Sequence, residues 1–205
     1  MAPATHHEYY LKRKVDIVLS LLGLILLSPL FLIIVLLILT DSGRPVFYRQ
    51  PRTGKGGIPF DILKFRTMIV NADKSSLLTI GLHDNRVTRT GYYLRKYKID
   101  ELPQLINVLK GEMSLVGPRP EVPKYTQLYS QRQKDVLSVR PGITDPASIL
   151  LKDENEMIAA SPDPEKFYIE KLIPEKLSIN LQYIERMSLK NDLRIIAKTL
   201  LAIIR

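Results

Sequence analysis

The chain has 205 residues and contains no cysteine, which excludes disulfides, thiolate catalysis and cysteine-ligated metal sites. Its length suffices for one compact domain with an additional membrane element, and no internal repeat or interdomain linker divides it. The formal net charge of +9 predicts an anionic partner, which would be nucleic acid, an anionic lipid or a phosphorylated substrate.

Residues 1–14 form a polar leader that ends in basic residues, and we leave residues 1–9 out of the fold prediction. Residues 15–40 are predicted to form a membrane helix, because the run from Ile17 to Leu39 is apolar without interruption. A helix needs about 20 such residues to cross a bilayer. The run is too long for a signal peptide, and no small-residue cleavage site follows it.

Two features of this segment favour a re-entrant helix, which enters and leaves the membrane on the same face. Pro29 removes one helical hydrogen bond and kinks the helix, and the Ser28 hydroxyl would satisfy a carbonyl that the proline frees. Basic residues flank both ends of the run, and such flanks favour the cytoplasm. A bend at Ser28–Pro29 leaves about 11 residues, or roughly 16 Å, on each side, which reaches one leaflet. A kinked helix that spans the bilayer is the alternative.

A β-hairpin is predicted directly after the membrane segment. Residues 45–50 read as a strand, residues 53–57 carry the glycines of a turn, and residues 60–65 alternate apolar and polar as a returning strand. Residues 71–85 have weak periodicity and are predicted to be a loop or a short helix. A short helix is expected over residues 92–97.

The next segment is predicted to be a helix that begins near Asp100. Leucine and isoleucine recur on one face from Leu102 to Leu109, and Gly111 ends the pattern. Residues 114–116 are expected to be extended, and residues 117–120 to be a loop.

Three further elements complete the predicted fold. Residues 122–139 are predicted to be helical, residues 164–187 are predicted to contain further helix, and Pro141 and Gly142 are predicted to form a turn between them. Residues 192–205 form a basic amphipathic helix, which suits either a membrane surface or packing on the core. The predicted fold is α+β and mostly helical, with a re-entrant membrane helix, a hairpin and interfacial helices around a small cytoplasmic catalytic domain in residues 41–205.

The adjacent acids Asp100 and Glu101 need an explanation in so basic a chain. Pro103 belongs in the first turn of a helix, so Asp100 is placed as the N-cap residue, and an N-cap aspartate followed by a glutamate is ordinary helix chemistry. The same position also suits catalysis, because a helix N-terminus attracts phosphate and a carboxylate there can attack phosphorus. The second carboxylate would then hold Mg²⁺.

A phosphate site at this acidic pair requires cations that converge on it. The candidates are Lys64, Arg66, Arg95 and Arg119. Arg119 lies between two prolines, which restrict its backbone and order its guanidinium to grip a phosphate or a carbonyl. A stiff surface turn with an exposed arginine is the alternative for this segment.

Four motifs occur in order after the apolar run: residues 64–68 (KFRTM), 100–105 (DELPQL), 117–120 (GPRP) and 140–144 (RPGIT). Together with the basic segment and the break at Ser28–Pro29, this set resembles the bacterial sugar transferases. These are small monotopic phosphoglycosyl transferases that begin polyprenol-linked glycan assembly. The resemblance covers about residues 10–200.

The resemblance implies an enzyme on the cytoplasmic face of the bacterial inner membrane. It would transfer a phosphosugar from a UDP-sugar to undecaprenyl phosphate and release UMP, by a ping-pong mechanism with a covalent intermediate on Asp100. Glu101 is implied as the Mg²⁺ ligand. The implied substrate-binding residues are Lys64, Arg66, Arg95, Arg119 and Arg140. The sequence leaves both a monomer and a homodimer open.

Two positions depart from the family pattern. After residue 144 many relatives continue with Gly-Leu-Ala-Gln, whereas this chain has Asp145-Pro146-Ala147-Ser148. Relatives often carry an aspartate where this chain has Asn180. Both departures follow the catalytic pair, and they leave the choice of sugar open.

Two other classes of function compete with the enzyme. A membrane-anchored scaffold without activity would use Asp100 only as a helix cap, worth about 1 kcal/mol. We discount a nucleic-acid-binding module, because the basic residues are dispersed, no aromatic-basic stacking motif occurs and the apolar run would have no role.

Overall fold

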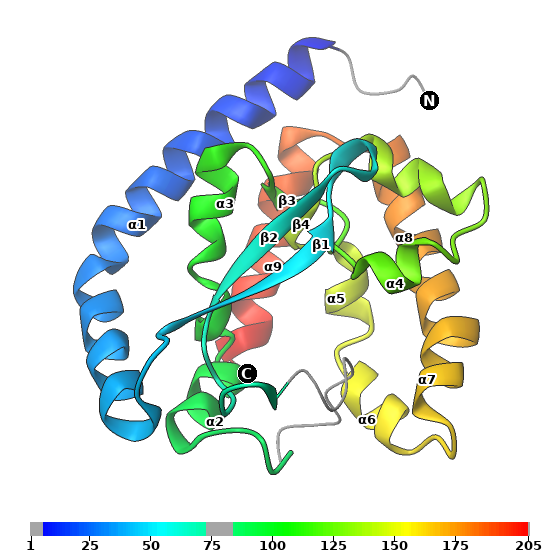
Figure 1. The fold of residues 1–205 in the computed structure, drawn as a ribbon. Coiled ribbons are helices and arrows are strands. Elements are labelled where there is room, and N and C mark those ends of the chain that lie inside the picture. Colours follow the sequence, from blue (N-terminus) through cyan, green and yellow to red (C-terminus); the bar gives the residue numbers. More distant parts are fainter. Residues whose placement is uncertain (1–5, 73–83, 205) are drawn as a thin grey trace.

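The computed structural model describes residues 6–72 and 84–204. The chain folds into a mostly helical α+β structure with one long apolar helix and a small hairpin (Figure 1). The long helix lies along one side, the hairpin crosses the middle, and α4, α7 and α8 lie on the other side. Most of the predicted loop or short helix over residues 71–85 lies outside the described residues.

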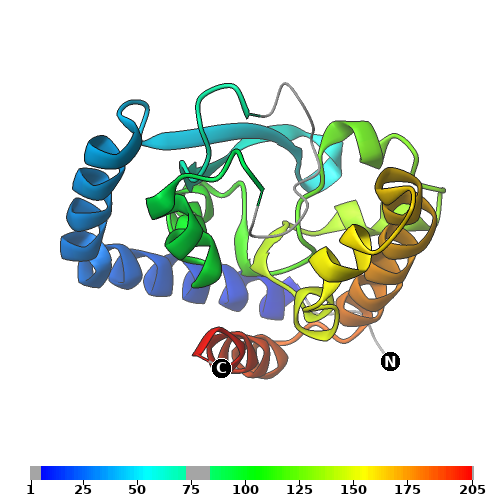
Figure 2. The same cartoon turned by 90° about the horizontal axis from the view of Figure 1, so that it is seen from below.

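The helix α1 is continuous from His6 to Ser42 and contains Pro29 in its interior. It therefore begins inside the leader that the fold prediction left out. Figure 2 shows that α1 consists of two arms that meet at a bend. Because a proline at position 29 has no N–H, the carbonyl of Ile25 loses its helical donor. The Ser28 hydroxyl donates a hydrogen bond to that carbonyl at 2.8 Å, as the sequence predicted.

The outer surface of α1 is apolar and unprotected by the rest of the chain. Leu26 and Leu32 are 77% and 62% exposed. By length and composition α1 is long and apolar enough to cross a membrane. On its inner side, Ile34 and Ile38 are buried against Phe65 of the hairpin.

The hairpin consists of the antiparallel strands β1 (Phe47–Thr53) and β2 (Pro59–Phe65), which confirms the prediction. A 3₁₀ turn, Lys55–Gly57, joins them. Directly after β2, the Arg66 guanidinium donates hydrogen bonds to the carbonyls of Ser42, Gly43 and Arg44. These bonds attach the end of α1 to the hairpin.

The segment around the acidic pair differs from the predicted helix. After α2 (Arg89–Lys96), the left-handed residue Lys98 (φ 56°) leads into a 3₁₀ turn, Ile99–Glu101. The helix α3 begins only at Gln104 and ends at Lys110, with Pro103 as its N-cap residue. The prediction that Asp100 is the N-cap residue is therefore wrong. Gly111 (φ 88°) ends α3 as predicted.

A second, two-stranded sheet pairs β3 (Ser114–Val116) with β4 (Gly142–Thr144) in parallel. The sequence predicted β3 but not β4. The continuous helix predicted over residues 122–139 is wrong, because the chain forms only the short helix α4 (Pro123–Thr126) and a 3₁₀ turn, Gln133–Ser138.

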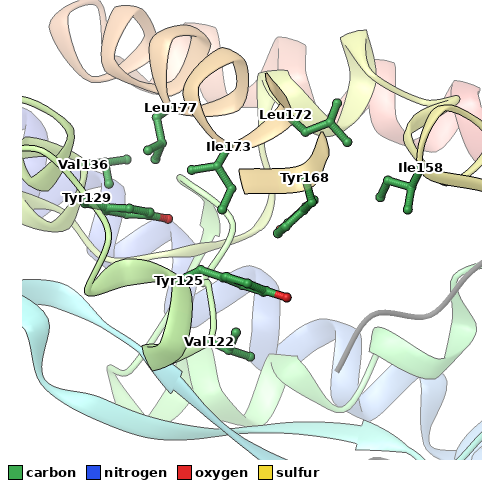
Figure 3. Close-up of a cluster of buried hydrophobic side chains, with 9 residues drawn as sticks. All are labelled: Val122, Tyr125, Tyr129, Val136, Ile158, Tyr168, Leu172, Ile173 and Leu177. Carbon is green, nitrogen blue, oxygen red and sulfur yellow. The ribbon is translucent and has the colours of Figure 1, made fainter. Parts of the chain in front are cut away.

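The C-terminal part is helical. The elements are α5 (Pro146–Leu150), α6 (Glu154–Ala159), α7 (Pro164–Phe167), a π-helical turn (Tyr168–Leu172), α8 (Ile173–Glu185) and α9 (Leu189–Ile204). The helix predicted over residues 164–187 is confirmed. Figure 3 shows the core cluster in which Tyr125 and Tyr168 meet edge to face, with ring centroids 5.2 Å apart.

The helix α9 packs on the domain through Asp192 and Ile195, which are 3% and 6% exposed. On its predicted apolar side, Ile196 packs against the core cluster that contains Ile195. Leu193, Leu200 and Leu201 are 50%, 56% and 61% exposed. Packing on the core therefore explains only part of the apolar side of α9.

Candidate active site

The candidate site lies where the turn that carries Asp100 and Glu101 meets β2. Asn107 of α3 fixes this junction, since its side chain accepts a hydrogen bond from Leu63 N at 3.0 Å and donates one to Asp61 O at 2.8 Å. These bonds set the position of β2 along α3. They place Lys64, the residue after Leu63, against the acidic turn.

Glu101 is held by two cations. Lys64 Nζ donates to Glu101 Oε1 at 2.8 Å, Arg119 donates to Oε2 at 3.1 Å, and a second Arg119 nitrogen donates to Oε1. Burial alone would raise the pKa of Glu101, but the charges of Arg119 and Lys64 outweigh it. The pKa of Glu101 therefore lies well below its usual value, and this carboxylate is ionised at neutral pH.

Asp100 differs from its neighbour. Within residues 6–72 and 84–204, no group donates a hydrogen bond to its carboxylate, although the residue is only 7% exposed. Burial raises the pKa of Asp100, and the charge of Glu101 raises it further, while Lys64 and Arg95 oppose the shift. The pair thus combines one carboxylate that is fixed by cations with one that accepts no hydrogen bond from the described residues.

The loop that carries Arg119 is fixed by its backbone. Gly117 N donates to Thr144 O, and Gly142 N donates to Pro118 O, both at 3.0 Å. A Cβ atom at Gly117 would lie 2.5 Å from a backbone oxygen, so only glycine fits this close approach. The ion pair with Glu101 raises the pKa of Arg119, which is a permanent cation.

Arg95 of α2 also faces the acidic pair. Burial lowers its pKa, and the charge of Asp100 opposes that shift. Its NH1 nitrogen is buried and has no hydrogen-bond partner within the described part of the chain. Arg95 therefore has a donor available for a ligand, which fits the substrate-binding role that the resemblance implied.

Two of the predicted substrate-binding residues lie elsewhere. Arg66 is engaged by the carbonyls at the end of α1. Arg140 donates to Gly111 O at 2.8 Å and to the Tyr9 hydroxyl at 3.2 Å, at the end of α3 opposite to Asp100. The structure therefore brings Lys64, Arg95 and Arg119 to the acidic pair and gives Arg66 and Arg140 other partners.

The acidic pair offers carboxylate oxygens, which are the ligands that Mg²⁺ prefers. No cluster of three or more histidine, cysteine, aspartate or glutamate side chains occurs among the described residues. Mg²⁺ commonly binds through one or two carboxylates together with substrate phosphates and water. A carboxylate offers about four lone-pair positions, of which Glu101 uses three. The acidic pair therefore fits an ion whose coordination the substrate completes.

The family model of bacterial sugar transferases matches residues 7–205 of the chain. The chain belongs to this family. The UDP-glucose:undecaprenyl-phosphate glucose-1-phosphate transferase of Caulobacter vibrioides is 38% identical over 192 residues, which cover 92% of this chain and 67% of that protein. The exopolysaccharide production protein ExoY of Sinorhizobium fredii is 37% identical over 207 residues, which cover 94% of this chain and 84% of that protein.

A further relative of this bacterial sugar transferase is named for another sugar. The UDP-N-acetylgalactosamine-undecaprenyl-phosphate N-acetylgalactosaminephosphotransferase of Aeromonas hydrophila is 37% identical over 198 residues, which cover 95% of this chain and 44% of that protein. The chain thus spans from 44% to 84% of the length of these three relatives. Family membership therefore does not fix the sugar.

Proposed function

We propose that this bacterial sugar transferase moves a sugar 1-phosphate from a UDP-sugar to undecaprenyl phosphate and releases UMP. This is the first membrane step in assembling a bacterial glycoconjugate. The observation that carries the proposal is the free, buried carboxylate of Asp100 beside a Glu101 that Lys64 and Arg119 hold in place. The names of the relatives support the same substrate classes.

The reaction proceeds in two displacements. An oxygen of Asp100 attacks the phosphorus that carries the sugar, the bond from that phosphorus to the bridging oxygen breaks, and UMP leaves with the bond electrons. An oxygen of undecaprenyl phosphate then attacks the same phosphorus, a diphosphate bond forms and the Asp100 carboxylate is regenerated. Nucleophilic catalysis of this kind divides one difficult transfer into two easier ones.

The neighbouring cations let an anionic nucleophile meet an anionic substrate. The charges of Lys64, Arg95 and Lys98 act on Asp100, and those of Arg119 and Lys64 act on Glu101, so more cations than the two carboxylates of the pair border the turn. This excess favours a diphosphate. Bound Mg²⁺, with Glu101 as its proposed ligand, would add further neutralisation of the phosphate charge.

The decisive experiment identifies the nucleotide that is released. The full chain is incubated with undecaprenyl phosphate and either UDP-glucose or UDP-N-acetylgalactosamine, and the nucleotide product is separated by chromatography. We expect UMP from the wild type and none from Asp100→Asn. The exposed Asp61→Asn, which removes the same charge, is the control and should retain activity. Release of UDP would refute the proposal and indicate an ordinary glycosyltransferase.

We also propose that residues 15–40 of α1 are re-entrant in the bacterial inner membrane, with the catalytic residues 41–205 on the cytoplasmic face. Both arms of α1 contact the same polar domain. Lys12 donates to Val116 O at 2.9 Å and pairs with Asp192, whereas Ile38 packs on Phe65. A domain that binds both arms lies on one side of the membrane. The exposed leucines of α9, beside Arg194 and Lys198, support contact of that helix with the same surface.

The absence of cysteine makes this topology directly testable. Single cysteines are placed at Tyr10, Leu26 and Ile58, which are 62%, 77% and 71% exposed. An impermeant thiol reagent added to inside-out vesicles should label positions 10 and 58 and leave position 26 protected by lipid. Labelling of positions 10 and 58 from opposite faces would contradict the re-entrant arrangement.

A further inference from the structure

The strongest remaining feature is a buried polar pair behind the Arg119 loop. Asp145, which is 0% exposed, begins α5, and Asn180, which is 3% exposed, comes from α8. Asn180 Nδ2 donates to Asp145 Oδ2 at 2.7 Å. The two departures from the family pattern, which are far apart in the sequence, are therefore joined by one hydrogen bond.

Asp145 connects this pair to the candidate site. Its Oδ2 atom also accepts a hydrogen bond from the backbone N–H of Arg119 at 3.4 Å, and its charge contributes to raising the pKa of Arg119. Its Oδ1 atom caps α5 by accepting from Ser148 N at 2.9 Å. One carboxylate thus contacts the start of α5, a residue of α8 and the backbone of Arg119.

The chemistry of the pair requires one acid and one amide. Only the amide nitrogen of Asn180 can donate to the carboxylate, and Asn180 Oδ1 has no partner within the described residues. An aspartate at position 180 would place a second carboxylate against the first one, and two buried carboxylates in contact cannot both be ionised without a large cost. The identity of residue 180 is therefore coupled to the acid at position 145.

We propose that Asp145 and Asn180 are positioning residues, which hold the Arg119 loop so that its guanidinium meets the nucleotide diphosphate. This proposal deepens the proposed function and rests on it. Arg119 supplies the contact with the substrate, Asp145 fixes the backbone of Arg119, and Asn180 orients the Asp145 carboxylate. The contact between Asp145 and Asn180 depends on the charge of the carboxylate as well as on the shapes of the two side chains. Variants that keep these shapes and change the charge therefore test the proposal.

The test uses three near-isosteric variants of the full chain in detergent. In Asp145→Asn the cap of α5 is retained, because asparagine is also a good N-cap residue. Asn180→Asp places two acids in contact, and the double variant moves the single acid from α5 to α8. Asp153→Asn is the matched control, since Asp153 is exposed and its side chain caps nothing. UMP binding is measured by calorimetry, and UMP release gives kcat and KM.

We expect Asp145→Asn to weaken UMP binding and raise KM by about tenfold with little change in kcat, because a charge-assisted contact behind a binding residue is lost. Asn180→Asp should weaken binding increasingly as the pH rises. The double variant restores one acid beside one amide. Its asparagine oxygen at position 145 stays on Ser148 N, however, so the amide NH2 group faces the Arg119 N–H and cannot accept from it. We therefore expect the double variant to bind UMP as weakly as Asp145→Asn does, and Asp153→Asn should match the wild type.

The outcomes separate this proposal from the proposed function. If the wild type releases UMP but Asp145→Asn binds UMP as tightly as the wild type, the positioning role is refuted and the proposed function is not. Wild-type UMP binding in the double variant would also refute the positioning role, because the Arg119 N–H has no acceptor at position 145 in that variant. If the wild type neither binds UMP nor releases it, both proposals fail together.

Discussion

Replacing Asn107 by leucine should disturb the junction that places Lys64 against the acidic turn. Asn107 is 1% exposed, and its side-chain amide accepts a hydrogen bond from Leu63 N and donates one to Asp61 O. Leucine has a similar volume but leaves both backbone groups without these partners. Asn107 Nδ2 also donates to Glu112 Oε2 at 2.7 Å, so three partly buried groups lose a hydrogen bond. Each lost bond costs about 1–1.5 kcal/mol, and the added apolar burial recovers about 1 kcal/mol. The expected net loss is about 3 kcal/mol.

Thermal unfolding followed by circular dichroism measures this loss. For a chain of this size, 1 kcal/mol corresponds to roughly 2–4 °C, so Asn107→Leu should lower Tm by about 6–12 °C. Asn155→Leu is the matched control, because Asn155 is exposed on α6 and should change Tm by less than about 2 °C. UMP release, measured well below Tm, should also fall, since β2 carries Lys64. An unchanged Tm for Asn107→Leu would refute the reasoning.

Three further predictions concern charge. The pKa of Asp100 is raised, and only its ionised form can attack phosphorus, so kcat/KM should rise with pH. The midpoint of this rise should lie above the ordinary aspartate pKa of about 3.9. A midpoint at or below that value would contradict Asp100 as the nucleophile. Lys12→Met leaves the buried Asp192 without its cationic partner and should lower the free energy of unfolding by about 3–5 kcal/mol. The double variant Lys12→Met with Asp192→Leu should lose less of this free energy, as measured by urea unfolding. Equal losses in the two variants would argue against a buried ion pair. Removing divalent cations with EDTA should abolish UMP release, and Mg²⁺ should restore it; full activity in EDTA would exclude the proposed metal.

Elements with a strong local pattern could be predicted from the sequence. The hairpin combines alternating strands with a glycine-rich turn, and Gly111 adopts the left-handed conformation that ends α3. The helix predicted over residues 122–139 was wrong for a physical reason. Tyr125 and Val136 have helical spacing in the sequence, but they are apolar because both pack into the core against α8. Tertiary burial produces the same periodicity as a helix.

The sequence predicted that Lys64, Arg95 and Arg119 would lie beside the acidic pair, and the structure places all three there. A basic residue in a motif, however, gives no sign of what it contacts, and Arg140 donates to the carbonyl of Gly111 at the end of α3. The contact between Asp145 and Asn180 depends on how α8 packs against α5, which local sequence does not encode.

The structure gives the two adjacent acids different electrostatic surroundings. Both are buried in one turn, so without other charges each would raise the pKa of the other. Arg119 and Lys64 bind Glu101 alone, which fixes Glu101 as an anion with a settled orientation. Asp100 receives no such hydrogen bond and keeps a raised pKa, which makes its ionised form the more basic and more nucleophilic of the two. The unequal distribution of cations, rather than the acids themselves, is therefore the basis on which we propose Asp100 as the attacking group.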